Sequence, residues 1–268
     1  MDTRKMQLCD IRQEVKNARE QLLEVIAQTD DILLQQNPRI QADYALKIGV
    51  WENELLKAQI EARRAKRKYA LAQAAANRGE EASNDAIEAQ LDKEFEEWEA
   101  LLEIKLAEYA DALERRTSTV PMKQKDAKEL KALYRKISKR LHPDVCMCSS
   151  DKAANFFVLA QRAYELGDID MLQSIEVATR EFERADDLNT MNQSELELEL
   201  TMVQAQLNVA QEKLEKVKAE KPYCLGALLK DPDWICAQVA ELKAQIKEAQ
   251  DVCEEYAVRL QTLMGGAK

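Results

Sequence analysis

Apolar residues recur at alternating steps of three and four along most of this 268-residue chain, and only an α-helix gathers residues of that spacing on one face. The chain holds 6 glycines and 5 prolines, and aromatic residues make up 5% of it. Sheets need frequent turns and strands rich in aromatic or β-branched residues, and no stretch alternates apolar with polar residues. The sequence therefore predicts an all-α protein built from long helices.

The first part of the chain is predicted to contain two helical segments. Residues 1–36 form an N-terminal heptad helix with an apolar seam from Leu8 to Ile32. Asn37-Pro38 interrupts that seam, with Asn37 as a helix cap and Pro38 at the first helical position. Residues 37–117 follow as a helical hairpin, and its two helices are expected to be antiparallel because a short loop joins them.

The last segment, residues 179–268, is predicted to form a second coiled-coil hairpin. Asn192 and Glu195 have the spacing of a capping box at the start of a heptad helix. Asp231-Pro232 supplies a cap and a first-position proline for the final helix. Both helices carry strict heptad seams, so they are expected to pair with each other in antiparallel orientation. The heptads alone leave dimerisation through the same seams open.

The segment between these coiled coils, residues 118–178, contains the motif on which the functional prediction depends. A basic amphipathic helix is predicted to end at Leu141, because Pro143 lacks an N–H and disfavours helical backbone at the residue before it. A second helix is predicted to end at Gly167, where glycine provides a C-terminal cap. The sequence His142-Pro143-Asp144 therefore lies in the loop of a helical hairpin.

This hairpin resembles the J-domain, the module of DnaJ-type co-chaperones. The resemblance rests on the run from Leu133 to Asp144, Leu-Tyr-Arg-Lys-Ile-Ser-Lys-Arg-Leu-His-Pro-Asp, and on Phe157 and Ala163-Tyr164 in the next helix. The family's Tyr-x-x-Leu-Gly sequence, glycine-phenylalanine stretch and zinc module are not in this sequence. The resemblance therefore implies an atypical, J-domain-only member with coiled-coil flanks.

The resemblance also implies that the chain binds a cytosolic DnaK-type chaperone and stimulates its ATP hydrolysis, without making or breaking bonds itself. The predicted helix is basic in a chain whose net charge is −10, and Lys131, Arg135 and Lys139 recur every four residues along it. Such a line of positive charge steers an acidic partner. Asp144 would accept hydrogen bonds from a partner arginine. The expected partner-binding set is Lys131, Tyr134, Arg135, Lys136, Lys139, His142, Pro143 and Asp144.

An alternative from another class is a coiled-coil scaffold that keeps the J-like hairpin as a structural bridge. A bridge would bury Asp144 and the line of Lys131, Arg135 and Lys139, whereas a working J-domain leaves them open to solvent. A weaker alternative is nucleic-acid binding through the basic cluster Arg63–Lys68. That cluster is more typical of a solvated face or of ion pairs with the Glu-rich helix that follows.

Neither an enzyme nor a cofactor or metal site is expected. His142 is the only histidine, and no Gly-rich phosphate loop or His-Glu-x-x-His sequence is present. A zinc site at His142, Cys146 and Cys148 would lack a fourth ligand. The cysteines do not have the spacing of a disulfide framework, so they are expected to be reduced. No apolar run approaches the roughly 20 residues of a membrane span, and a cytoplasmic location is expected.

Overall fold

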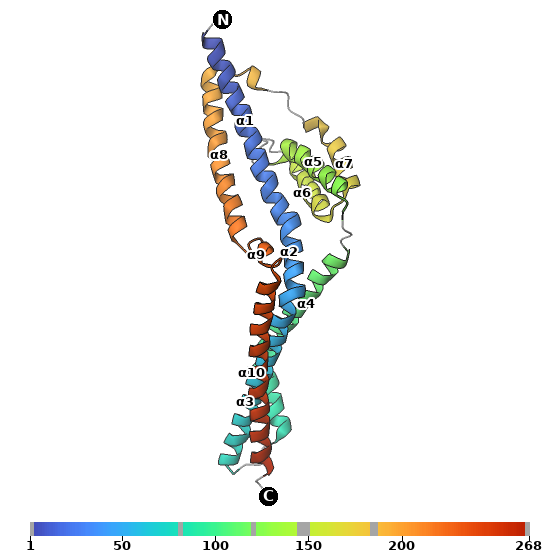
Figure 1. Ribbon diagram of the computed structural model, residues 1–268, viewed down its shortest axis with the longest axis vertical. Coiled ribbons are helices and arrows are strands. Elements are labelled where there is room, and N and C mark those ends of the chain that lie inside the picture. Colours follow the sequence, from blue (N-terminus) through green and yellow to red (C-terminus); the bar gives the residue numbers. More distant parts are fainter. Residues whose placement is uncertain (1–2, 80–82, 119–121, 144–150, 183–186, 266–268) are drawn as a thin grey trace. The chain divides into compact units, whose positions relative to one another are not determined.

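The structure is a computed structural model, and it describes residues 3–79, 83–118, 122–143, 151–182 and 187–265. All regular structure in these ranges is helical, which confirms the predicted all-α class (Figure 1). The chain divides into two compact units, residues 1–39 with 120–224 and residues 40–119 with 225–268. Residues 120–178 of the J-like segment lie within the first unit, whereas the last predicted segment, 179–268, is divided between the two.

A pair of long helices, α1 (Thr3–Asp31) and α8 (Gln193–Ala219), forms one side of the first unit. The predicted heptad seams meet here, because Val15 packs in one apolar cluster with Leu196 and Leu22 packs in the next with Val203. Residue numbers thus rise together along the two helices, and the pair is parallel.

The second unit is built around α3 (Val50–Asn77). Its antiparallel partner is α4 (Asn84–Ser118), and Ile60 packs there against Leu91 and Phe95, as the predicted hairpin requires. The other partner is α10 (Pro232–Gly265). Lys243 lies 4.2 Å from the centre of the Trp51 ring, and the Tyr69 and Tyr256 ring centres are 5.8 Å apart. Residue numbers rise together along α3 and α10, so this pair is also parallel.

The predicted pairing of α8 with α10 is not the one observed, because α8 packs on α1 and α10 packs on α3. A short loop can join only antiparallel neighbours, whereas parallel partners must come from segments far apart in the chain. A heptad seam requires an apolar partner without specifying which helix supplies it. The sequence therefore predicted the seams of α8 and α10 correctly and the pairing of these two helices incorrectly.

The predicted helix start at Asn37-Pro38 is wrong, because the backbone stays helical from α1 into α3. The π-helical turn η1 (Ile32–Gln36) precedes Pro38, and α2 (Asn37–Tyr44) and a second π turn, η2 (Ala45–Gly49), follow. Asn37 has helical φ and ψ of −59° and −48°, and its N–H donates to the Ile32 carbonyl. A π turn accommodates the missing N–H and the bulk of a proline ring inside a helix.

The J-like segment forms a three-helix core within the first unit. It contains α5 (Gln124–Leu141), α6 (Asp151–Leu166) and α7 (Ile169–Ala178), and all three contribute to one apolar cluster. Gly167 ends α6 with a φ of +71°, as predicted, and Asp168 caps α7 by accepting a 2.9 Å hydrogen bond from the Met171 N–H. The remaining elements are short: η3 (Arg180–Phe182), η4 (Asp187–Asn189) and α9 (Leu225–Leu228).

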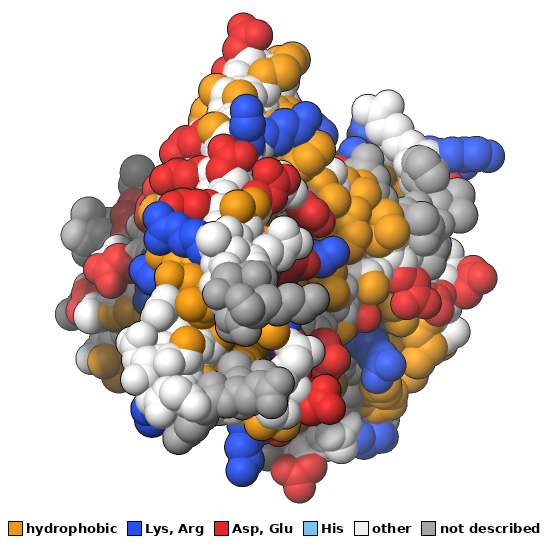
Figure 2. Space-filling view, turned by 90° about the horizontal axis from the view of Figure 1, so that it is seen from below, with side chains coloured by type: hydrophobic (Ala, Val, Ile, Leu, Met, Phe, Trp, Pro, Cys, Tyr) orange, Lys and Arg blue, Asp and Glu red, His pale blue; other side chains and the backbone are white. Residues whose placement is uncertain are grey.

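The surface carries no large field of one charge on the face shown in Figure 2, where hydrophobic, acidic and basic side chains are interspersed. No helix within the described ranges is both long and apolar enough to cross a membrane. The described cysteines are free thiols, and no group of potential metal ligands gathers among the described residues.

Candidate partner-binding surface

Helix α5 separates an apolar face from a basic one, as its sequence predicts. Leu130, Ile137 and Leu141 point into the three-helix core, where each is less than 5% exposed. The opposite face carries exposed basic side chains: Lys131, Arg135, Lys136 and Lys139. Burial of the apolar face therefore fixes the direction in which these cations point.

Two of the cations form ion pairs with α1. The Lys131 ammonium lies 2.8 Å from an Asp31 oxygen, and the Arg135 guanidinium lies 2.5 Å from a Glu24 oxygen. The side chains of Lys131 and Arg135 nevertheless remain 58% and 51% exposed. Lys139 is exposed and ion-pairs with no described residue. The basic line is thus open to solvent while its first two members are paired within the chain.

Tyr134 does not face a partner, which corrects the expectation from the sequence. It is 2% exposed, and its ring lies 4.3 Å from the ring of Tyr164, centre to centre. Its hydroxyl donates a 2.7 Å hydrogen bond to Asp30. Burial and the neighbouring Asp30 carboxylate raise the pKa of Tyr134. A tyrosine can be buried in this way because its ring packs in the core while its hydroxyl finds an acceptor.

Asp31, next to Asp30, is a second anchor between α1 and the J-like helices. It accepts a 2.7 Å hydrogen bond from the Tyr164 hydroxyl as well as the contact from Lys131. Burial alone would raise the pKa of Asp31, but hydrogen bonds from Lys131, Tyr164 and Gln36 outweigh it and lower the pKa. Sequence reasoning did not assign α1 to this surface. The signal that the sequence offers for this contact is the adjacent pair of acidic residues, Asp30 and Asp31, within the apolar seam of α1.

The loop after α5 begins as proline requires. His142 is extended, with φ −63° and ψ 128°, and its backbone N–H donates to the Ser138 carbonyl at 2.9 Å. His142 is 8% exposed, and its ring meets Phe157 edge-on with the ring centres 5.0 Å apart. This burial corrects the expectation that His142 faces a partner, whereas Pro143 is exposed. Asp144 lies outside the described residues, so its exposure stays a prediction.

The cysteines of the zinc alternative, Cys146 and Cys148, also lie outside the described residues. The proposed zinc ligand His142 is turned toward Phe157 in the core. The absence of a zinc site therefore stays a prediction.

Arg140, at the end of α5, turns away from the basic line and ties α5 to α7. It donates to the carboxylate and to the backbone carbonyl of Glu176, both at 3.1 Å, and the two side chains are each 11% exposed. Arg180 approaches the same carboxylate at 3.0 Å. Hydrogen bonds from Arg180 and Arg140 lower the pKa of Glu176. This buried pair has no signature in the sequence, where Arg140 reads as one more surface cation.

The other basic cluster, Arg63–Lys68, lies against the acidic helix α4. Arg67 makes two 2.7 Å hydrogen bonds to Glu94 and lowers the pKa of that carboxyl to about 2. Arg63 stacks on the Trp98 ring at 4.6 Å. Further ion pairs join Arg64 to Glu88, Asp92 and Glu99, and Lys68 to Glu88. These contacts match the interpretation of the cluster as a source of ion pairs within the hairpin.

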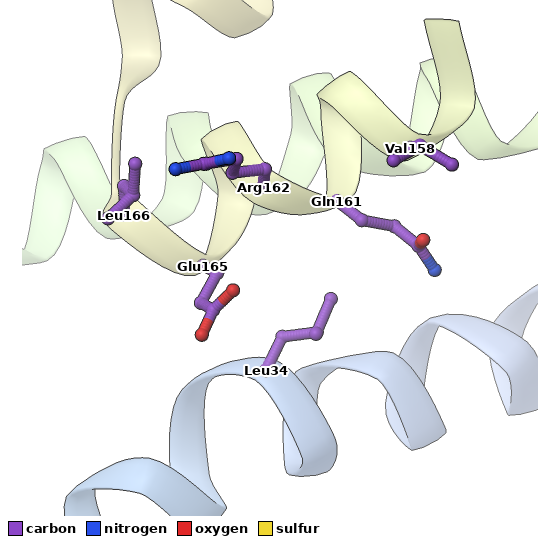
Figure 3. Close-up of a pocket in the computed structure, with 6 residues that line it drawn as sticks. All are labelled: Leu34, Val158, Gln161, Arg162, Glu165 and Leu166. Atoms are coloured by element: carbon purple, nitrogen blue, oxygen red, sulfur yellow. The ribbon is translucent and has the colours of Figure 1, made fainter. Parts of the chain in front are cut away.

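A pocket of about 490 Å³ lies between α6 and the helical turn that follows α1. Its lining is mixed in chemistry, and Figure 3 shows Leu34 of that turn and Glu165 of α6 facing each other across it. Beside it, the Gln35 amide donates to the Tyr164 carbonyl. The pocket therefore borders the contact between α1 and the J-like helices.

Comparison with protein-family models, with curated proteins and with solved structures found no match to this chain.

Proposed function

We propose that this protein is a co-chaperone of the J-domain type, which binds a DnaK-type chaperone and stimulates its ATP hydrolysis. The observation that best supports this proposal is the exposed basic face of α5. Lys131, Arg135 and Lys139 lie on one line that leads toward the His142-Pro143 loop. The core of α5, α6 and α7 holds that line on a rigid helix.

The proposed mechanism is electrostatic recognition followed by a shift in the partner's conformation. The basic line attracts an acidic surface and orients the loop during encounter. Asp144 then accepts charge-assisted hydrogen bonds from an arginine of the partner. Binding accelerates hydrolysis only if this chain favours the partner conformation that is competent to hydrolyse ATP.

The proposal is tested by single-turnover ATP hydrolysis by a purified DnaK-type chaperone, with and without the full chain. We expect the wild-type protein to raise the rate and Asp144→Asn to remove the increase, because asparagine cannot supply the carboxylate charge. Asp170→Asn is the matched control: it makes the same change at an exposed position on α7 and should retain full stimulation. Equal rates with wild type and Asp144→Asn would contradict the proposal.

A scaffold role is the second candidate, and the anchoring of the J-like helices to α1 favours it. Tyr134 and Tyr164 donate hydrogen bonds to Asp30 and Asp31, so the hairpin is fixed to the long helix rather than tethered by a linker. A scaffold would give the same hydrolysis rate with and without the chain.

A further inference from the structure

The contact of α1 with helices α5 and α6 consists of two layers that differ in burial. In the inner layer, Tyr134 and Tyr164 are 2% exposed and donate hydrogen bonds to Asp30 and Asp31. The outer layer consists of the ion pairs Lys131–Asp31 and Arg135–Glu24, whose cations are more than half exposed. The inner hydrogen bonds hold the helices together. The outer ion pairs can therefore break while the inner hydrogen bonds remain.

The outer layer occupies the groups that an acidic partner would use. Exposed ion pairs are weak, because water screens the charges and both side chains lose conformational freedom. Carboxylates of a docked partner, shielded from water by the interface, make stronger charge-assisted hydrogen bonds with the same cations. Lys131 and Arg135 can therefore move from α1 to a partner while α5 stays in place.

We propose that the acidic face of α1, through Glu24 and Asp31, competes with the partner for the basic side chains of α5 and so limits the affinity of the chain for that partner. This inference rests on the proposed function. Glu24 is the better site for a test, because Asp31 also accepts the Tyr164 hydrogen bond in the inner layer.

The test is the dissociation constant between the full chain and a purified DnaK-type chaperone, measured by biolayer interferometry at low salt. We expect Glu24→Gln to bind about two- to fivefold more tightly than wild type, because releasing one exposed ion pair allows a change of that size. Glu20→Gln removes the same charge one turn earlier on α1, where Glu20 is exposed and pairs with no described residue. This control should bind like wild type.

A second pair of variants separates competition from a general change in charge. In an Arg135→Ala background, Glu24→Gln should give no gain, because there is no guanidinium left to release. A gain that persists in that background, an equal gain from Glu20→Gln, or no gain from Glu24→Gln would each overturn the inference while leaving the proposed function intact. Absence of binding by the wild-type chain would instead overturn the proposed function, and the competition with it.

Discussion

Arg140 and Lys139 are neighbours in the same basic run, yet their side chains have different environments. Lys139 is exposed, whereas Arg140 is held against Glu176 by two 3.1 Å hydrogen bonds. Charge type alone therefore does not assign a residue to the partner-binding surface. The position of each residue relative to the three-helix core decides it.

Glu176→Gln is expected to lower the free energy of unfolding by roughly 2 kcal/mol, because it removes the negative charge that accepts hydrogen bonds from Arg140 and Arg180 at a largely buried site. Urea unfolding followed by circular dichroism measures the change. Glu165→Gln makes the same substitution at an exposed position on α6 and should change stability by less than about 0.5 kcal/mol. Similar effects from the two variants would show that the Arg140–Glu176 pair contributes little.

At the scale of the element, two glycines differ in whether the backbone requires them. Gly167 ends α6 with a φ of +71°, a conformation that strains other residues, and a Cβ there would lie 2.8 Å from the end of the Met122 side chain. Gly49 is helical, and a Cβ there would meet its nearest neighbour at 3.7 Å, an ordinary contact. Glycine is therefore needed at the first position and not at the second.

Gly167→Ala should accordingly lower the free energy of unfolding by about 1 kcal/mol. Gly49→Ala should raise it by up to about 1 kcal/mol, because alanine favours helix and fits the space. Thermal unfolding of the two variants beside wild type tests the direction of both changes in stability. A stabilising Gly167→Ala would mean that the turn adopts another conformation.

At the scale of the whole chain, parallel helix pairs join residues that are far apart in sequence. Arg19 contacts Glu199 at 2.6 Å, and the Lys47 ammonium donates to the Leu229 carbonyl at 2.7 Å. In each unit, a helix from the N-terminal part of the chain therefore packs against a helix from its C-terminal part. Because closing a long loop costs conformational entropy, we expect contacts of such long sequence separation to form after the local helices.

Acid should destabilise the first unit through Asp31 and Glu176. The folded state lowers the pKa of both carboxyls, so each contributes stability above its unfolded pKa and loses it as the pH falls through the folded pKa. The free energy of unfolding should be lower at about pH 3 than at about pH 7. Asp31→Asn, which cannot ionise, should show a shallower pH dependence in the same urea titrations. An unchanged dependence would exclude Asp31 as a contributor.

Local sequence signals determined the helices of this protein and several of their ends. The Asn192–Glu195 capping box, the glycine cap at Gly167 and the extended residue before Pro143 are all as predicted, because each depends on groups a few residues apart. The apolar face of α5 also fixed the direction of its basic line. These features required no knowledge of the fold.

Only the tertiary structure decided which helices meet when they lie far apart in the chain. Heptad seams are interchangeable, so the sequence could not choose α1 for α8 or α3 for α10. For the same reason it could not place Asp30 beside Tyr134, which removed that tyrosine from the predicted surface, or Glu24 beside Arg135. The physical cause is that burial and ion pairing depend on neighbours in space, which the spacing of residues along one helix does not specify.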